Sequence, residues 1–398
     1  MRLGVVTSSF PRTEGDHAGV FVLELCKALV DRGHRVEVIA PDPGRGQPPS
    51  WPGIRVRWVR YGAPRSWQAI CYDAGIPENV RRRPWLAAQG PLVGSALALE
   101  VSRRSERWEG VISHWLVPSG LATAIACRGT PHVAVAHSAD VWLLRTLPVV
   151  GSAVVQRIAS GSTTIAAINP ELVASLEELS GRSTMGRTVL LPIGPDSMPA
   201  PQPEAMVKLR ERLEASGISD DHFAVAAIAR LVPIKGVDLL LRALADHAAP
   251  GSAAVIAGDG PERPRLEALA RDLEVPTAFL GPVDAEARAA VLARADVLIV
   301  PSRVMPNGRS EGTPLAAIEA MAAGVPVVAS DVGGLRWALD GAGVLFEPGS
   351  AAGLARDLAR LRADGALRDA LSTAGRRRAG DFGWARSAAT LEALLEAS

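Results

Sequence analysis

Two carboxylates in the stretch "EGTPLAAIEAMAAGVPVV" are separated by seven residues, with Glu311 just before an expected helix and Glu319 within it. Thr313 can cap the first free amides, Pro314 suits the first helical position, and a Gly ends the element after about three turns. Glu319 lies four residues beyond Leu315 on the apolar face, where burying an unpaired carboxylate is costly. Either both carboxylates bind hydroxyl groups of a ligand, or Glu311 caps a surface helix and Glu319 forms an ion pair.

Two cations lie in a turn that joins a strand to a helix. Lysine is scarce, with three residues against 40 arginines. The presence of Lys235, five residues after Arg230, therefore favours a specific role for it. Two fixed cations beside a helix start suit a diphosphate, and the amides of Gly312, Thr313 and Leu315 are a second place for an anion. The alternative is a surface arginine and a lysine whose stem packs on the protein.

Three glycines occupy comparable turns. Gly19 lies in the first turn from strand to helix, where the absence of a Cβ lets backbone amides touch a phosphate. Gly258 and Gly260 lie in "AGDGPERPRLEAL" and allow close backbone approach, although a tight turn alone explains them equally well.

Polar side chains also follow two buried strands of the first half. His137 and Asp140 in "VAVAHSADVW" should emerge at the carboxyl end of one strand, and His114 and Trp115 at the end of its neighbour. A lone histidine is often structural, but the strand-end position favours a functional His137. There is no Ser/His/Asp set, no Gly-x-Ser-x-Gly, no metal-ligand cluster and no Asp-x-Asp, so we expect no metal and no cofactor.

The composition describes a globular enzyme of two domains. At 398 residues the chain exceeds one ordinary core, and 48% hydrophobic with 21% charged residues exclude a disordered or fibrous protein. Three widely spaced cysteines argue for a reducing compartment, so we expect a cytoplasmic protein. No apolar run reaches the 18 or more residues that would span a bilayer.

The first half is the more basic and holds seven of the nine tryptophans. The candidate for a helix that lies on the inner face of a membrane is Arg81 to Arg83 with the following "PWLAAQGPLVGSALALEV". We favour the alternative of an ordinary helix packed on a sheet. No nucleic-acid motif accompanies the charge.

Short β-branched runs alternate with helical patterns, which predicts an α/β protein with two doubly wound, Rossmann-like domains facing a central cleft. We place the domains at 1–195 and 196–398, with the terminal helix, about 384–398, as a candidate to cross back to the first. The expected strands are RLGVVTS, IRVRWV, GVISHW, HVAVAHS, TTIAAIN, TVLLPI, FAVAAIA, AAVIAGD, AFLG, DVLIVPS, VPVVAS and GVLFE.

Taken together, several motifs resemble glycosyltransferase family 4, and the likeness is densest from Ala229 to Gly334. The Glu-x7-Glu element is its most specific part. The motifs are "GHRVEVIAP", "HSADVW", "ARLVPIKG", "GDGPERPRLE", "FLGPVD" and "PSRVMPNGRSEGTPLAAIEAMAAGVPVVASDVGG". The resemblance implies a GT-B fold and transfer of a sugar, with retention and without a metal, from a nucleotide diphosphate donor to a hydroxyl acceptor such as a glycan, a lipid-linked or a small molecule.

The resemblance also implies roles in the second half. Arg230 and Lys235 would bind the diphosphate and neutralise the leaving nucleotide, and Glu319 would accept hydrogen bonds from the ribose. Glu311 would hold hydroxyls of the donor sugar. Asp284 would pair with a guanine edge, unless the base is held by backbone contacts.

In the first half, His137 would face the transferred sugar or the acceptor, and the Gly19 amide would approach the donor phosphate. His114, Trp115 and Asp140 would lie on the acceptor side. Two positions depart from the family pattern, because Ala229 replaces a Gly before the Arg and the early Gly-Gly turn has Ala18 as its first residue.

Other functions stay open for this architecture. A phosphorylase would need a lysine for a Schiff-base cofactor, and Lys235 lies in a loop better suited to phosphates. A sugar-nucleotide epimerase shares the fold but uses no acceptor. A non-catalytic protein that binds sugar nucleotides would keep the pocket without the chemistry.

Overall fold

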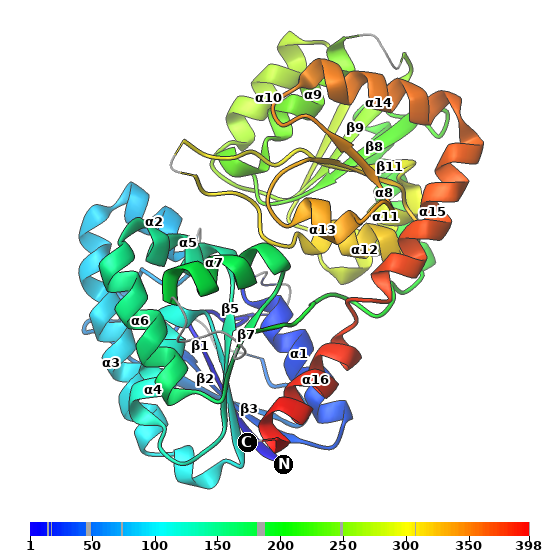
Figure 1. Ribbon diagram of the computed structural model, residues 1–398. Helices are drawn as coiled ribbons and strands as arrows, with labels where there is room; N and C mark the ends of the chain where they lie inside the picture. The colour runs from blue at the N-terminus through cyan, green and yellow to red at the C-terminus, as the bar shows by residue number, and fades with distance from the viewer. Residues whose placement is uncertain are drawn as a thin grey trace. The chain divides into compact units, whose positions relative to one another are not determined.

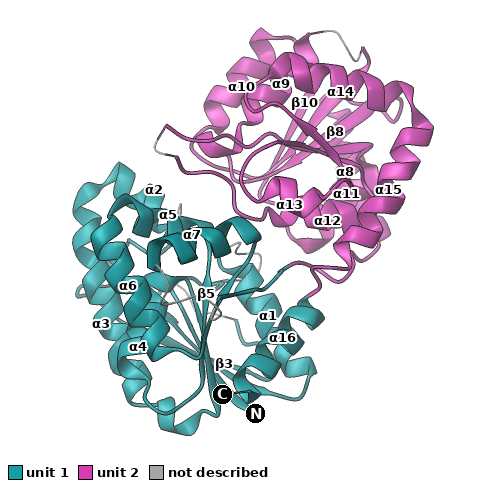
Figure 2. Cartoon of the chain, in the orientation of Figure 1, with its two compact units in different colours: residues 1–193, 384–398 teal, residues 194–383 magenta. Residues whose placement is uncertain are grey.

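The computed structural model describes residues 1–13, 16, 18–44, 49–72, 75–180, 188–246, 250–306 and 308–397. The chain forms two compact units, residues 1–193 with 384–398 and residues 194–383 (Figure 2). Each unit is built on one parallel sheet with helices on both faces (Figure 1). The expected α/β class with two doubly wound domains is confirmed.

The sheet of the first unit has the order β3-β2-β1-β4-β5-β6-β7, and each neighbouring pair is parallel. Such a sheet is covered on both faces, so its strands are long apolar runs. The strands are β1 (Arg2–Thr7), β2 (Arg35–Pro41), β3 (Ile54–Val59), β4 (Gly110–His114), β5 (His132–Ala136), β6 (Thr164–Ala167) and β7 (Thr188–Leu190).

Successive residues of β1 pack on opposite faces of this sheet. Val5 belongs to the cluster that includes residues of α1 and α16, and Val6 to the cluster that includes residues of α3. The α-helices are α1 (Val20–Asp31), α2 (Ile76–Arg82), α3 (Gln89–Ser102), α4 (Leu121–Ala126), α5 (Ser138–Thr146), α6 (Pro148–Gly161), α7 (Pro170–Ser180) and α16 (Trp384–Glu396). Shorter turns are η1 (Arg65–Trp67), η2 (Pro84–Ala88), η3 (Ser105–Arg107) and η4 (Leu116–Gly120).

The sheet of the second unit has the order β10-β9-β8-β11-β12-β13, again parallel throughout. Numbered within the unit this is 3-2-1-4-5-6, the order of dinucleotide-binding folds, which bind ligands at the carboxyl ends of the strands. The strands are β8 (Phe223–Ile228), β9 (Ser252–Ala257), β10 (Thr277–Gly281), β11 (Val297–Val300), β12 (Val327–Ser330) and β13 (Val344–Phe346).

Two apolar clusters cover the two faces of this second sheet. One contains residues of α8, α11, α12 and α13, and the other contains residues of α9, α10 and α14. The helices are α8 (Pro203–Glu214), η6 (Pro233–Lys235), α9 (Val237–Ala245), α10 (Arg263–Asp272), α11 (Ala285–Arg294), α12 (Leu315–Ala323), α13 (Leu335–Leu339), α14 (Ala351–Ala363) and α15 (Gly365–Ala379).

Strand β2 is the main element that the sequence did not predict. Polar Arg35 and Glu37 alternate with valines, so the segment lacks a continuous apolar run. Glu37 is satisfied inside the fold, because Trp108 donates to it at 3.1 Å and Arg57 pairs with it at 3.2 Å.

The start of α12 differs from the prediction by one residue. Pro314 takes the cap position in an extended conformation, and Leu315, not Pro314, is the first helical residue. Gly324 ends the helix with a left-handed φ of 80°, as its position predicts.

The segment considered for a membrane surface forms η2 and α3. Val93, Leu97 and Val101 are buried, and α3 packs on α4 and β2, as the favoured interpretation predicts. Within the described ranges, no helix combines the length and the apolar character needed to cross a bilayer.

Candidate functional site

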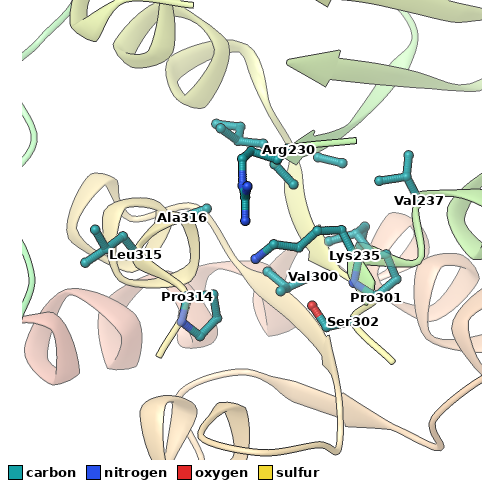
Figure 3. A pocket seen from close by; sticks show the side chains of 13 residues that line it. Arg230, Lys235, Val237, Val300, Pro301, Ser302, Pro314, Leu315 and Ala316 are labelled. Carbon is teal, nitrogen blue, oxygen red and sulfur yellow. The ribbon is translucent and has the colours of Figure 1, made fainter. Parts of the chain in front are cut away.

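A cavity of about 200 Å³ lies at the carboxyl ends of β8 and β11 in the second unit (Figure 3). Three segments form its wall: the end of β8 with the loop that follows, the end of β11, and the start of α12. The lining residues are Ala227, Ile228, Ala229, Arg230, Lys235, Val237, Ile299, Val300, Pro301, Ser302, Pro314, Leu315 and Ala316.

The two predicted cations, Arg230 and Lys235, line this one cavity. Lys235 ends the short turn η6, and Gly236 follows in a left-handed conformation with φ of 60° as the cap of α9. A Cβ on Gly236 would lie 2.0 Å from the carbonyl oxygen of Pro301, so only glycine lets the turn pack against the end of β11. This packing brings Lys235 beside Ser302, as Figure 3 shows.

Glu311 meets Lys235 directly. Lys235 Nζ lies 2.6 Å from Glu311 Oε2, and Ser302 Oγ donates to the same oxygen at 2.8 Å. Burial alone would raise the pKa of Glu311, but the charge and hydrogen bond of Lys235, with the Ser302 hydroxyl, lower it below its ordinary value. Glu311 is therefore an ionised carboxylate, held by one oxygen.

The backbone of Glu311 is fixed as well. The amide of Gly334 donates to the Glu311 carbonyl at 3.2 Å. A Cβ on Gly333, whose φ is 52°, would lie 2.0 Å from the same carbonyl oxygen. The loop after β12 thus supports the segment from Glu311 through Gly312 and Thr313 to the start of α12, where Pro314 and Leu315 face the cavity.

Glu319 is buried, with 9% of its surface exposed, and it is paired. Arg288 Nη1 on α11 lies 2.7 Å from Glu319 Oε1. Glu319 follows Leu315 and Ala316 by about one helical turn, so it continues the face of α12 that lines the cavity. The interpretation of Glu319 as part of an ion pair is confirmed.

The two glycines after β9 have a packing reason of their own. A Cβ on Gly258 would lie 1.9 Å from the carbonyl oxygen of Ala229, and one on Gly260 would lie 2.3 Å from that of Leu231. The loop that carries Arg230 rests on both residues, so they are required whether or not a ligand approaches.

Asp284 is a helix cap. It precedes α11, and its Oδ1 accepts a hydrogen bond from the Ala287 amide at 2.8 Å. That contact occupies one of its carboxylate oxygens. The position directly before a helical pattern was the sequence signal for this role.

In the first unit, Gly19 caps α1 with a left-handed φ of 69°, and a Cβ there would lie 2.3 Å from the Ser9 carbonyl oxygen. Glycine is therefore needed for the turn itself.

His114 and His137 come together at the ends of β4 and β5. Nδ1 of His114 lies 3.3 Å from Nε2 of His137, and both rings are buried. Burial lowers the pKa of His114 to about 3, and burial together with its neighbour lowers the pKa of His137 too. Phe21 and Trp115 pack on His137 with ring centroids 4.9 and 5.0 Å away, which makes an aromatic cluster of neutral rings.

Asp140 is fully occupied by backbone. Its Oδ1 accepts from the amides of His137 and Val141 at 2.9 Å, and Oδ2 accepts from the Leu116 amide at 2.5 Å. It lies in the first turn of α5, where it forms a capping box with His137, and burial raises its pKa to about 7. These contacts join the start of α5 to the segment that follows β4, and a place for Asp140 on the acceptor side stays a prediction.

Sequence reasoning missed Ser302, Arg288 and Phe21. Ser302 directly follows an expected strand, so its position was a usable signal. Arg288 is one of many helical arginines and carried no signal. Among the residues that the structure describes, no three His, Cys, Asp or Glu side chains gather as metal ligands would.

Residues 18–194 match the family model described as a glycosyl transferase 4-like domain, and residues 210–378 match glycosyl transferases group 1. A D-inositol 3-phosphate glycosyltransferase of Geodermatophilus obscurus is 30% identical, over 100% of this chain and 88% of the relative. The chain therefore belongs to glycosyltransferase family 4 and is an enzyme of that class.

Solved structures agree on the fold. Sucrose-phosphate synthase of Thermosynechococcus elongatus has a TM-score of 0.77 at 22% identity, covering 100% of this chain and 99% of that one. Anabaena HepE, in complex with UDP-glucose, has a TM-score of 0.72 at 19% identity and covers 100% of both chains. Both units thus form a GT-B fold.

Proposed function

We propose that the chain transfers a sugar from a nucleotide diphosphate donor to a hydroxyl acceptor, with retention at the anomeric carbon and without a metal ion. The observation that carries the proposal is the convergence of Arg230, Lys235 and the start of α12 on one cavity. Two cations and a helix N-terminus are a strong site for a diphosphate.

In this proposal Lys235 has two tasks. Its ammonium group neutralises charge that builds up on the departing diphosphate, and it keeps Glu311 ionised beside the donor sugar. Because Lys235 and Ser302 both use Oε2, the second oxygen of Glu311 is proposed to accept hydrogen bonds from sugar hydroxyls.

Retention is proposed to follow a front-face path. The bond between the anomeric carbon and the diphosphate oxygen breaks while the acceptor oxygen attacks from the same face, and a donor phosphate oxygen takes the acceptor proton. This path needs no side-chain nucleophile, and the cavity wall consists of Arg230, Lys235, Ser302 and apolar residues.

The remaining roles concern binding. Glu319 is proposed to accept hydrogen bonds from the ribose hydroxyls, since it continues the cavity face of α12. In the first unit, His137 is proposed to face the transferred sugar or the acceptor as a neutral ring, and the Gly19 amide to approach the donor phosphate.

A second proposal concerns contact of the first unit with a membrane surface. Trp85, Leu92 and Leu99 are exposed at 53%, 42% and 52%, and Arg83, two positions before Trp85, is exposed too. Sedimentation with vesicles with and without anionic lipid tests it, because loss of co-sedimentation in Trp85→Ser is expected only if this surface binds.

The central experiment screens UDP, GDP and ADP sugars by thermal shift and then assays transfer. A bound donor raises the melting temperature by mass action. The acceptor panel includes inositol phosphates, because a relative is named as a D-inositol 3-phosphate glycosyltransferase. NMR of the product gives the anomeric configuration, and an inverted product would overturn the retaining path.

Two alternatives predict different results. An epimerase would convert the donor sugar when no acceptor is present, and a non-catalytic binding protein would show a thermal shift without turnover across the panel.

A further inference from the structure

Arg288 on α11 has no role in the activity proposed above. Its Nη1 is 2.7 Å from Glu319 Oε1, and its side chain is only 21% exposed. The two residues come from different helices and are 31 positions apart in the sequence. The contact is thus a tertiary one between α11 and α12.

The contact restrains Glu319 through one oxygen. Burying a carboxylate without a partner is costly, and the guanidinium supplies the compensating charge. Within the described part of the chain, no hydrogen bond to Oε2 of Glu319 is found, so this oxygen is available to a ligand. A carboxylate that keeps one oxygen fixed presents the other in a defined direction.

The guanidinium of Arg288 also has one nitrogen that makes no hydrogen bond within the described part of the chain. Its Nε is buried and makes no hydrogen bond with any described residue. The guanidinium therefore holds Glu319 through Nη1 alone, among the contacts of the described residues.

We propose that Arg288 is a positioning residue that orients Glu319 for the ribose hydroxyls of a nucleoside diphosphate and so makes binding depend on the 2′-hydroxyl. The inference rests on the proposed function, since it takes Glu319 as the ribose ligand. It adds a residue that acts through Glu319 and sets the preference for ribose over deoxyribose.

The test compares ribo and 2′-deoxy ligands by isothermal titration calorimetry. UDP, GDP and ADP are titrated against dUDP, dGDP and dADP with the wild-type chain, Arg288→Met and Arg288→Lys. A hydrogen bond to a charged group is worth about 1.5–3 kcal/mol, so the wild type should prefer the ribonucleotide by about tenfold or more. The preference should fall below about threefold in Arg288→Met and take an intermediate value in Arg288→Lys.

The quantity compared is the ratio of the affinity for the ribonucleotide to the affinity for its 2′-deoxy form. A loss of stability alone would not change this ratio. Arg294→Met is the matched control, because Arg294 lies on the same helix and pairs with Asp296 at 3.5 Å, away from Glu319. It should keep the wild-type ratio even if its melting temperature falls. Glu319→Gln should lose the ratio as Arg288→Met does, and the double variant should lose no more.

The outcomes separate the two proposals. If the wild type binds a ribonucleotide in preference to its deoxy form and Arg288→Met keeps that preference, the role of Arg288 is wrong and the proposed function stands. If the wild type binds none of the three nucleotides, the proposed function fails and the role of Arg288 with it. If Arg288→Met does not fold, the ratio in Arg288→Lys decides, and an unchanged ratio overturns the proposal.

Discussion

Lys235 Nζ and Glu311 Oε2 are 2.6 Å apart, although 76 positions separate the two residues in the sequence. The pair joins the loop after β8 to the segment that leads into α12. A lysine of the cavity wall and a buried carboxylate are thereby held together, which is what the proposed function requires of them.

Replacing Lys235 by alanine should lower turnover about a hundredfold. The expected loss is that of one electrostatic contact with the leaving group, on the order of 3 kcal/mol. Steady-state transfer with the donor found by thermal shift measures it. Lys208→Ala, on the exposed face of α8, is the matched control and should keep full activity. Near-normal turnover in Lys235→Ala would remove this residue from the proposed mechanism.

Transfer should not depend on a divalent ion. Arg230, Lys235 and the start of α12 already provide positive charge for the diphosphate. Initial rates in EDTA and in added Mg²⁺ should agree within about twofold. A loss of tenfold or more in EDTA, restored by Mg²⁺, would contradict the proposal.

Gly258→Ala should destabilise the second unit by about 1–3 kcal/mol, because the new Cβ collides with the Ala229 carbonyl in a backbone conformation that favours glycine. Movement of the Ala229 carbonyl would also displace the neighbouring Arg230, so donor affinity should fall together with stability. Urea unfolding and nucleotide titration measure the two effects. Gly90→Ala, where nothing lies within 4 Å of the added Cβ, should be neutral or slightly stabilising.

Buried histidines should make the first unit sensitive to acid. Burial lowers the pKa of His114 to about 3 and that of His132 to about 4, whereas both titrate near 6.5 in an unfolded chain. Protons therefore bind the unfolded chain first, so this stability is complete above about pH 6.5 and is lost as the pH falls toward 4. Each histidine contributes up to about 1.4 kcal/mol per pH unit.

The His132→Gln variant isolates this effect. Its urea midpoint should fall less steeply than that of the wild type between pH 7 and pH 5. The raised pKa of Asp140 acts with the opposite sign over part of this range, since its contribution is lost as the pH rises toward 7. Comparing two chains that differ only at residue 132 removes that contribution, and equal slopes would contradict the prediction.

The fold was largely predictable because parallel strands buried on both faces are apolar runs. β5, β8 and β11 are such runs, and their order with the helices predicts two doubly wound domains. β2 was not predicted because Arg35 and Glu37 interrupt its pattern, and the partners of Glu37, Arg57 and Trp108, lie elsewhere in the chain, where no local pattern reveals them.

The candidate site was predictable where position along a strand decides it. Arg230 and Lys235 follow β8, so the carboxyl edge of the sheet brings them to one cavity. The partnership of Arg288 with Glu319 depends on how α11 and α12 pack, which spacing within either helix does not define. Asp284 has a local capping role that its position before a helical pattern indicates, and its contact with a base stays a prediction.

Helix α16 packs on α1 and on β4 and β5, and Leu395 lies against Gly110 at the start of β4. On the ribosome this helix emerges only after all of the second unit has been made. Until then, the face of the first unit that α16 covers stays exposed while the 190 residues of 194–383 are synthesised. Because the first unit is made of two distant segments of the chain, we expect chaperones to bind that face during translation.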